Sequence, residues 1–261
     1  MTADDTTMEH RPRITSLPGD ARLVRISEPS WAWVRAIALE QEPPAEITEE
    51  QIVELELVGL LIDAPGKEGG LVIDPHWQHF LRSALSSPVG IELVCVDGDR
   101  AWTTRIRIAG RVVAIIDQSR EVTADAETMQ LGRRADAVIL GLTTIEHLSE
   151  TFEALVPQRP AFTAADPAPA PAGLADAPAL AEVQMLVIAS PTPEQTVISG
   201  GSWYAYGQDG EQLAVLVPGE DGAEARELDP GSLTAAMRAK VIAAIGHVTA
   251  HSTAHAAGSA A

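Results

Sequence analysis

Cysteine, aromatic residues and basic residues are all scarce in this chain, and each scarcity narrows what the protein can be. The single cysteine, Cys95, excludes an internal disulfide bond and a cysteine-based zinc cluster, and it is typical of a reducing compartment. Aromatic residues make up 4% of the chain while apolar residues make up 46%, so aliphatic side chains have to form the core. The formal net charge of −19 at pH 7 repels phosphate backbones, which predicts that nucleic acid is not a partner.

Long apolar runs are also missing. A membrane-spanning helix needs about 20 consecutive apolar residues, and no such run occurs. The first residues carry no apolar segment of the kind found in signal peptides. These absences predict no membrane insertion and a cytoplasmic location. The length of 261 residues suits one large domain or two halves that share a core.

Helix signals dominate the N-terminal half, which we place at residues 21–156 after a loose leader at 1–20. The alternation at 22–26 predicts a strand, and a short helix capped by Ser30 should follow it. Thr48 and Gln51 have the spacing of a capping box, which predicts a helix running to about residue 62. Asp74 followed by Pro75 predicts the start of another helix.

From Val89 onward the apolar period changes from 3.6 to 2, which indicates a sheet. We expect strands at 91–96, 102–108 and 112–116, with a short polar strand near 128–131. Asp97-Gly98 is a dipeptide that favours a tight hairpin turn. Apolar residues then recur at three- and four-residue steps from Val138 to Leu155, which predicts one amphipathic helix.

The second half of the chain repeats this order. Residues 157–180 hold six prolines and nine alanines in 24 positions, a composition typical of an extended linker. The C-terminal half, 181–248, is expected to hold four strands and then a helix, and 249–261 a disordered tail.

The shared order of strands and a helix at 91–155 and 183–248 predicts a duplicated unit. The predicted fold class is therefore α+β, with two antiparallel sheet-plus-helix units related by a pseudo-twofold axis and extra N-terminal helices.

One segment resembles a known family. The run VGLLID…GLVIDPHWQHFLRSALSSPVGIELVCV, from Val58 to Val96, is similar to the EspG family of type VII (ESX) secretion-associated proteins. The ending, Trp203-Tyr204 through Leu228-Asp229-Pro230 into a final amphipathic helix, also resembles that family. With the duplicated order, the resemblance covers roughly residues 20–248. None of its motifs is catalytic.

The resemblance implies a cytosolic chaperone that recognises secreted helical-hairpin proteins of the PE/PPE or WXG100-like kind and keeps them soluble before export. It implies no cofactor and carries over no contact residue. The Pro/Ala-rich linker is longer and more biased in composition than the resemblance requires.

Large aromatic residues gather on one expected strand, and this gives the first candidate for a partner-binding surface. Alternate residues of a strand point to opposite faces, so Trp203 cannot share a face with Tyr204 and Tyr206. An outward-facing aromatic residue is a common interface anchor, whereas helices on both faces would bury all three. Arg105 and Arg107 alternate with apolar residues and can meet an acidic partner or only solvent.

The hypotheses of a catalytic site and of a metal site have weaker support in the sequence. His76 and His79, and the stripe His247, His251 and His255, have spacings that place imidazoles on one helix face, as a transition-metal site needs. Asp97 and Asp99 form a carboxylate pair that the hairpin turn already explains. No nucleophile elbow or phosphate loop occurs in the sequence.

The preferred hypothesis is therefore a binding chaperone or adaptor without a catalytic residue, metal or cofactor. An enzyme or small-molecule-binding α+β protein is the alternative. A winged-helix DNA reader formed by residues 48–85 is less favoured, because the helix that would read DNA holds one arginine, Arg82. The identity of the substrate pair, the oligomeric state and the role of the linker stay open.

Overall fold

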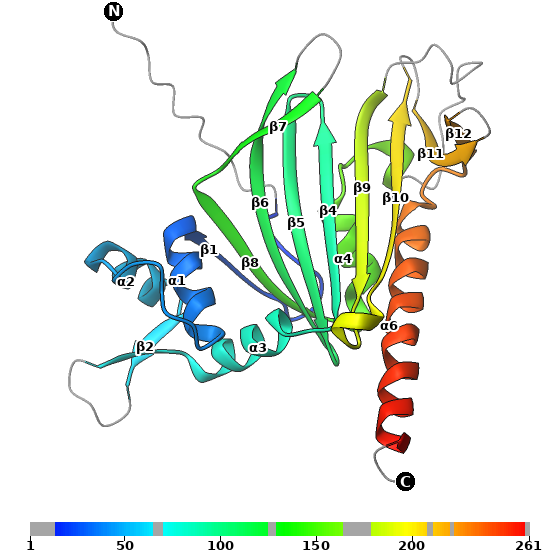
Figure 1. Cartoon of the computed structure of the whole chain (residues 1–261). Helices are drawn as coiled ribbons and strands as arrows, with labels where there is room; N and C mark the ends of the chain where they lie inside the picture. Colours follow the sequence, from blue (N-terminus) through cyan, green and yellow to red (C-terminus); the bar gives the residue numbers. More distant parts are fainter. Residues whose placement is uncertain are drawn as a thin grey trace, which may run out of the picture.

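The protein has an α+β fold built on one large antiparallel sheet (Figure 1). The computed structural model describes residues 14–64, 70–124, 129–163, 179–207, 211–219 and 222–258. The strands are β1 (Arg22–Ser27), β2 (Leu61–Asp63), β3 (Leu71–Ile73), β4 (Val89–Asp97), β5 (Arg100–Ala109), β6 (Val112–Ala124), β7 (Met129–Arg134), β8 (Ala137–Thr144), β9 (Ala179–Ala189), β10 (Val197–Tyr206), β11 (Gln212–Gly219) and β12 (Gly222–Leu228). The helices are α1 (Glu28–Ala38), α2 (Glu49–Leu57), α3 (Pro75–Leu85), α4 (Leu148–Leu155), α5 (Pro160–Thr163) and α6 (Leu233–Gly258), with short 3-10 turns η1 (Ile145–His147) and η3 (Pro193–Gln195).

Ten of the strands form a single sheet that joins the two halves of the chain. Its order is β1-β8-β6-β5-β4-β9-β10-β11-β12, with β7 paired to β6, while β2 and β3 form a separate two-stranded ribbon. The halves meet where β4 pairs with β9, with Leu93 opposite Met185 at the middle of the pair. The expected α+β class is confirmed.

Helices α4, α5 and α6 pack on one face of this sheet. Alternate residues of the central strands, such as Leu93 and Val187, point to this face and are buried against helix residues such as Phe152 and Met237. The aliphatic side chains of the strands supply most of this core, as the low aromatic content predicted.

Helices α1, α2 and α3 pack on the opposite face, but only toward the β1 edge. Their buried side chains, including Trp31 and Trp77, form a second core with strand residues such as Leu140. In Figure 1 these helices lie beside and below the strands at the β1–β8 edge, away from β9 and β10.

Several local predictions are confirmed. Thr48 and Gln51 form a reciprocal capping box at the start of α2, and the Asp74 side chain accepts backbone N–H bonds at the start of α3. Gly98 has the positive φ of +61° that the β4–β5 hairpin requires. Two details differ, since Ser27 rather than Ser30 caps α1, and α2 ends at Leu57.

The helix predicted from Val138 to Leu155 is wrong over its first half. Residues 137–144 form β8, which lies between β1 and β6, and only 148–155 are α-helical. Apolar residues are buried on both faces of β8, so its sequence lacks the alternation that reveals a half-buried strand. The first strand set therefore has one strand more than the second.

The expected boundaries shift where chain ends and the linker pack onto the sheet. Ile14, within the expected leader, is buried in the core, and so are Ala161 and Phe162 of the expected linker. Residues 1–13 of the expected leader and 164–178 of the expected linker lie outside the described residues, while Ala179 and Leu180, at the end of the expected linker, already belong to β9. Helix α6 continues to Gly258, so the backbone from 249 to 258 is helical rather than a disordered tail. The side chains at 252–258 and residues 259–261 lie outside the description.

Candidate functional site

The strands β5, β4, β9 and β10 expose a broad surface on the face that carries α1–α3, and no described helix covers it. We call this surface the open face. Its side chains come from alternate strand positions, because the other positions point into the core beneath α4 and α6. Its residues are Gly90, Glu92, Val94, Val96, Ala101, Thr103, Arg105, Arg107, Glu182, Gln184, Leu186, Ile188, Ile198, Gly200, Ser202, Tyr204 and Tyr206, of which Gly90, Val96, Ala101 and Thr103 are buried.

Strand register fixes which of these side chains are neighbours. One row across the strands runs Arg105, Glu92, Leu186 and Gly200. The next row, farther from the β4–β5 hairpin, runs Arg107, Gly90, Ile188 and Ile198. Each row therefore begins with an arginine on β5 and becomes apolar or side-chain-free toward β10.

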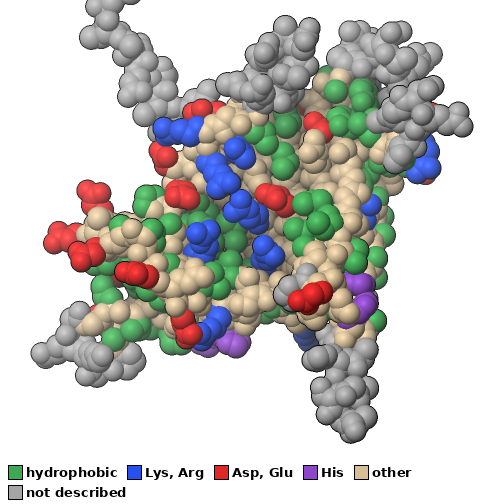
Figure 2. All heavy atoms as spheres, in the orientation of Figure 1, with side chains coloured by type: hydrophobic (Ala, Val, Ile, Leu, Met, Phe, Trp, Pro, Cys, Tyr) green, Lys and Arg blue, Asp and Glu red, His purple; other side chains and the backbone are tan. Residues whose placement is uncertain are grey.

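The predicted arginines lie at the β5 side of the open face. The Arg105 Nε lies 3.6 Å from the Glu92 Oε1, an exposed and loose ion pair. The Arg107 guanidinium lies over Gly90, where a Cβ atom would be 2.4 Å from its Nη1 atom. Figure 2 shows basic side chains gathered in a band on this face. Both arginines thus lie on the open face.

The predicted aromatic residues divide between the two faces, as strand alternation requires. Trp203 is buried in the core, whereas Tyr204 and Tyr206 lie on the open face with ring centroids 5.7 Å apart. The Tyr204 hydroxyl donates a 2.7 Å hydrogen bond to the Glu182 carboxylate. Burial first, and then this carboxylate, raise the pKa of the Tyr204 phenol, and the same two causes raise the pKa of Tyr206. Both phenols are therefore neutral hydrogen-bonding groups over the physiological range.

Aliphatic side chains on β9 and β10 lie across β4 from the arginines. Ile198 is 61% exposed and is paired across the strands with Ile188, while Leu186 is also exposed. Sequence analysis did not single out these residues, although Ile198 falls at the start of β10. Exposed aliphatic groups and arginine guanidiniums on one face are complementary to a protein surface that carries both apolar and acidic groups.

A small basic hollow at the β6–β7 side was also not predicted. It is lined by Thr103, Arg105, Ile116, Gln118, Arg120 and Arg134. The Arg120 Nη2 donates to the Gly132 carbonyl, but its Nε and the Thr103 hydroxyl have no hydrogen-bond partner among the described residues. The sequence holds one signal that could have revealed this hollow. Beyond residue 116, Gln118 and Arg120 continue the period-2 alternation of β6.

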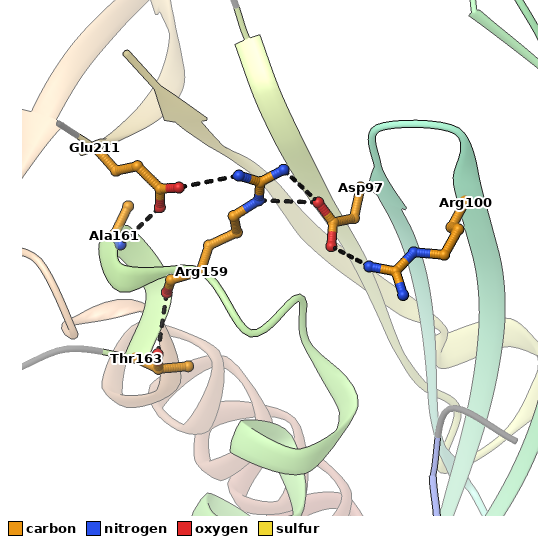
Figure 3. A network of polar contacts seen from close by, with 6 residues as sticks. All are labelled: Asp97, Arg100, Arg159, Ala161, Thr163 and Glu211. Atoms are coloured by element: carbon orange, nitrogen blue, oxygen red, sulfur yellow. Dashed lines mark hydrogen bonds and ion pairs between the residues drawn. The ribbon is translucent and has the colours of Figure 1, made fainter. Parts of the chain in front are cut away.

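The Asp97 carboxylate takes part in a network of hydrogen bonds and ion pairs (Figure 3). It accepts hydrogen bonds from Arg159 at 2.9 Å and from Arg100 at 3.0 Å. Arg159 also donates to Glu211 at 3.1 Å, and the second oxygen of Glu211 accepts from the Ala161 backbone N–H. The network ties the β4–β5 hairpin to the segment around α5 and to the start of β11. Asp99 has no part in it.

The histidine pairs fall on two different helices. His247 and His251 have ring centroids 4.2 Å apart on α6, while the side chain of His255 is outside the described residues. His79 contacts Phe80 on α3. Within the described ranges, no three His, Cys, Asp or Glu side chains are grouped as a metal site would need.

The described part of the chain includes no helix that is both long and apolar enough to cross a membrane. No protein-family model matches the chain, and no curated protein is similar to it at a significant level. The geometry of the open face therefore carries the functional argument.

Proposed function

We propose that this protein is a binding chaperone or adaptor that holds a helical protein partner on its open face. The partner would present an apolar tip flanked by at least one carboxylate. The aliphatic side chains on β9 and β10 would cover the apolar tip, and the arginines on β5 would meet the acidic group. Nothing in this role requires a cofactor.

The observation that carries the proposal is the composition of the open face in a chain of net charge −19. Aliphatic residues such as Ile198 stay exposed there, on the same face as arginines that have no close carboxylate partner among the described residues except the loose pair of Arg105 with Glu92. Exposed apolar surface favours aggregation unless a partner covers it, and a large net charge keeps the free carrier soluble.

The partner class follows from the resemblance to the EspG family. By that analogy the cargo is a secreted helical pair of the PE/PPE or WXG100-like kind, and the carrier works in the cytoplasm before type VII export. The resemblance rests on short motifs and on element order, so it enters here as part of the proposal.

We also propose that the two strand sets descend from one duplicated unit. The order β6-β5-β4 on one side of the central pair and β9-β10-β11 on the other supports this, because both sets run outward from β4–β9 in chain order. An antiparallel central pair is what a pseudo-twofold axis between Leu93 and Met185 would produce. Each set is followed by a helix, α4 or α6, on the same face.

Co-expression with candidate helical pairs encoded near this gene tests the function. A pair that co-purifies through size exclusion, without added nucleotide or metal, is the expected result. Failure with every such pair would refute the chaperone role.

Variants then test the surface. Ile198→Asp places a charge on the open face, and Ile242→Asp is its matched control because Ile242 is 56% exposed on α6. Ile198→Asp should weaken the complex at least about thirtyfold, the effect of losing a central anchor. Ile242→Asp should leave it intact. Equal effects of the two variants would show that the partner binds elsewhere.

A further inference from the structure

The hollow between β5, β6 and β7 carries positive charge that no acidic group in its lining balances. Its charged lining consists of three guanidiniums, those of Arg105, Arg120 and Arg134, and it includes no carboxylate. Arginine is protonated at every working pH, so the three groups repel one another permanently. Among the described residues, only Arg105 of the three forms an ion pair, with Glu92, and that pair is loose at 3.6 Å.

Two donors inside the hollow have no acceptor. Thr103 is 8% exposed, and its hydroxyl has no hydrogen-bond partner among the described residues. The Nε of Arg120 is also buried and also has no hydrogen-bond partner among the described residues. The Nη2 of the same guanidinium donates a 3.0 Å hydrogen bond to the Gly132 carbonyl. Buried donors are nearly always satisfied in proteins, so a pair of them at one hollow points to an acceptor that comes from outside the chain.

Size limits what this acceptor is. The enclosed part of the hollow measures about 10 Å³, close to the space that a single water-sized group occupies. One oxygen atom fits inside, and the rest of its group stays at the mouth, where Arg134 is exposed. An oxygen with negative charge would satisfy the buried donors and relieve the repulsion among the arginines together.

We infer that this hollow is a binding site for one oxyanion group, either a carboxylate or a small inorganic anion such as sulfate. One oxygen accepts from the Thr103 hydroxyl and the Arg120 Nε, and a second oxygen pairs with Arg134 at the mouth. The site is a property of the free protein and does not depend on the helical partner proposed above.

The test is anion binding to the full chain, measured by titration calorimetry and by thermal unfolding. Sodium sulfate and sodium acetate are compared with sodium chloride at equal ionic strength. Sulfate also stabilises proteins generally through exclusion from their surfaces, so the decisive quantity is the difference between variants. Arg134→Gln removes one charge at the mouth, and Arg226→Gln removes one from the exposed edge strand β12.

We expect Arg134→Gln to weaken the binding about tenfold, as the loss of a charge-assisted hydrogen bond does. Arg226→Gln should bind as the unaltered protein does. Stronger binding of acetate than of sulfate identifies a carboxylate as the ligand, and the reverse identifies an inorganic oxyanion. Absence of saturable binding for both anions, or equal weakening by the two variants, would overturn the inference.

Thr103→Val provides a second test with two opposite effects. It replaces an unsatisfied buried hydroxyl with a methyl group of the same shape, so the free protein should unfold at a higher temperature. The same change removes a donor, so the affinity for the anion should fall severalfold. Unchanged affinity in this variant would also overturn the inference, because the hydroxyl would then have no part in the site.

Discussion

Replacing Arg159 by methionine should destabilise the fold far more than a typical surface substitution. Methionine keeps the length of the apolar stem and removes only the guanidinium. That guanidinium joins Asp97, at the end of β4, to Glu211, just before β11 (Figure 3). It therefore links the first strand set to the second at a point outside the apolar core.

The size of the effect follows from the burial of the three side chains. Asp97 is 11% exposed and Glu211 13%, while Arg159 itself is 30% exposed. Removing one partner of a fully buried ion pair costs about 3–5 kcal/mol, and an exposed pair is worth about 0.2–1 kcal/mol. Asp97 keeps Arg100 and Glu211 keeps the Ala161 N–H, so we expect an intermediate loss of about 2 kcal/mol. For a chain of this size, the midpoint of thermal unfolding should fall by about 4–8 °C.

Thermal and urea unfolding followed by circular dichroism measure this loss. The matched control is Arg133→Met, because Arg133 pairs with Asp136 and both side chains are exposed. A double-mutant cycle with Glu211→Gln isolates the coupling between the two charges. If Arg159→Met shifts the midpoint no more than Arg133→Met does, the network contributes nothing to stability and the reasoning fails.

Two further predictions concern the tyrosines and a helix cap. The chain has two tyrosines, Tyr204 and Tyr206, and both phenols have a raised pKa in the folded state, so their near-ultraviolet phenolate absorbance should appear at higher pH in native than in denatured protein. The stability that these neutral phenols contribute is present below the ordinary pKa of 10.0 and is lost as the pH rises further. Coincident phenolate titration curves for native and denatured protein would contradict this prediction. Thr48→Ala should cost about 1 kcal/mol by removing the hydroxyl that accepts from the Gln51 N–H. Thr48→Ser should restore most of that loss in urea unfolding, and equal stability of the Ala and Ser variants would show that the cap has no effect.

The sequence predicted elements whose signals are local. The capping box at Thr48, the Asp74 cap and the Asp97-Gly98 turn each depend on a few adjacent residues, and all three are present. β8 was misread because burial on both faces erases the alternation that marks a strand. The prediction of a linker over 157–180 is wrong near its start, because Ala161 and Phe162 pack into a core formed by distant strands. Composition over 24 positions cannot reveal such tertiary contacts.

In the candidate site, as in the fold, the sequence predicts features that depend on one strand and does not predict features that depend on the pairing of distant strands. Alternation along single strands placed Arg105 and Arg107 on a wet face and separated Trp203 from the two tyrosines. It could not show that both groups share one face, because that depends on the pairing of β4 with β9 across half of the chain. The basic hollow depends on three strands, β5, β6 and β7, whose register is set only in the folded sheet.

The contrast between the net charge and the open face constrains how a partner is recognised. At physiological salt, exposed charges more than about 8 Å apart are largely screened. The repulsion between an acidic partner and the chain of charge −19 is therefore screened beyond that distance, and so is the attraction to the arginines. For the proposed partner, attraction would act only in contact, where Arg105 and Arg107 on β5 lie across β4 from Leu186 and Ile188 on β9, so that ion pairs and the burial of aliphatic groups would form on the same face. If the proposed helical partner binds there, such a surface gives selectivity at contact rather than rapid long-range capture.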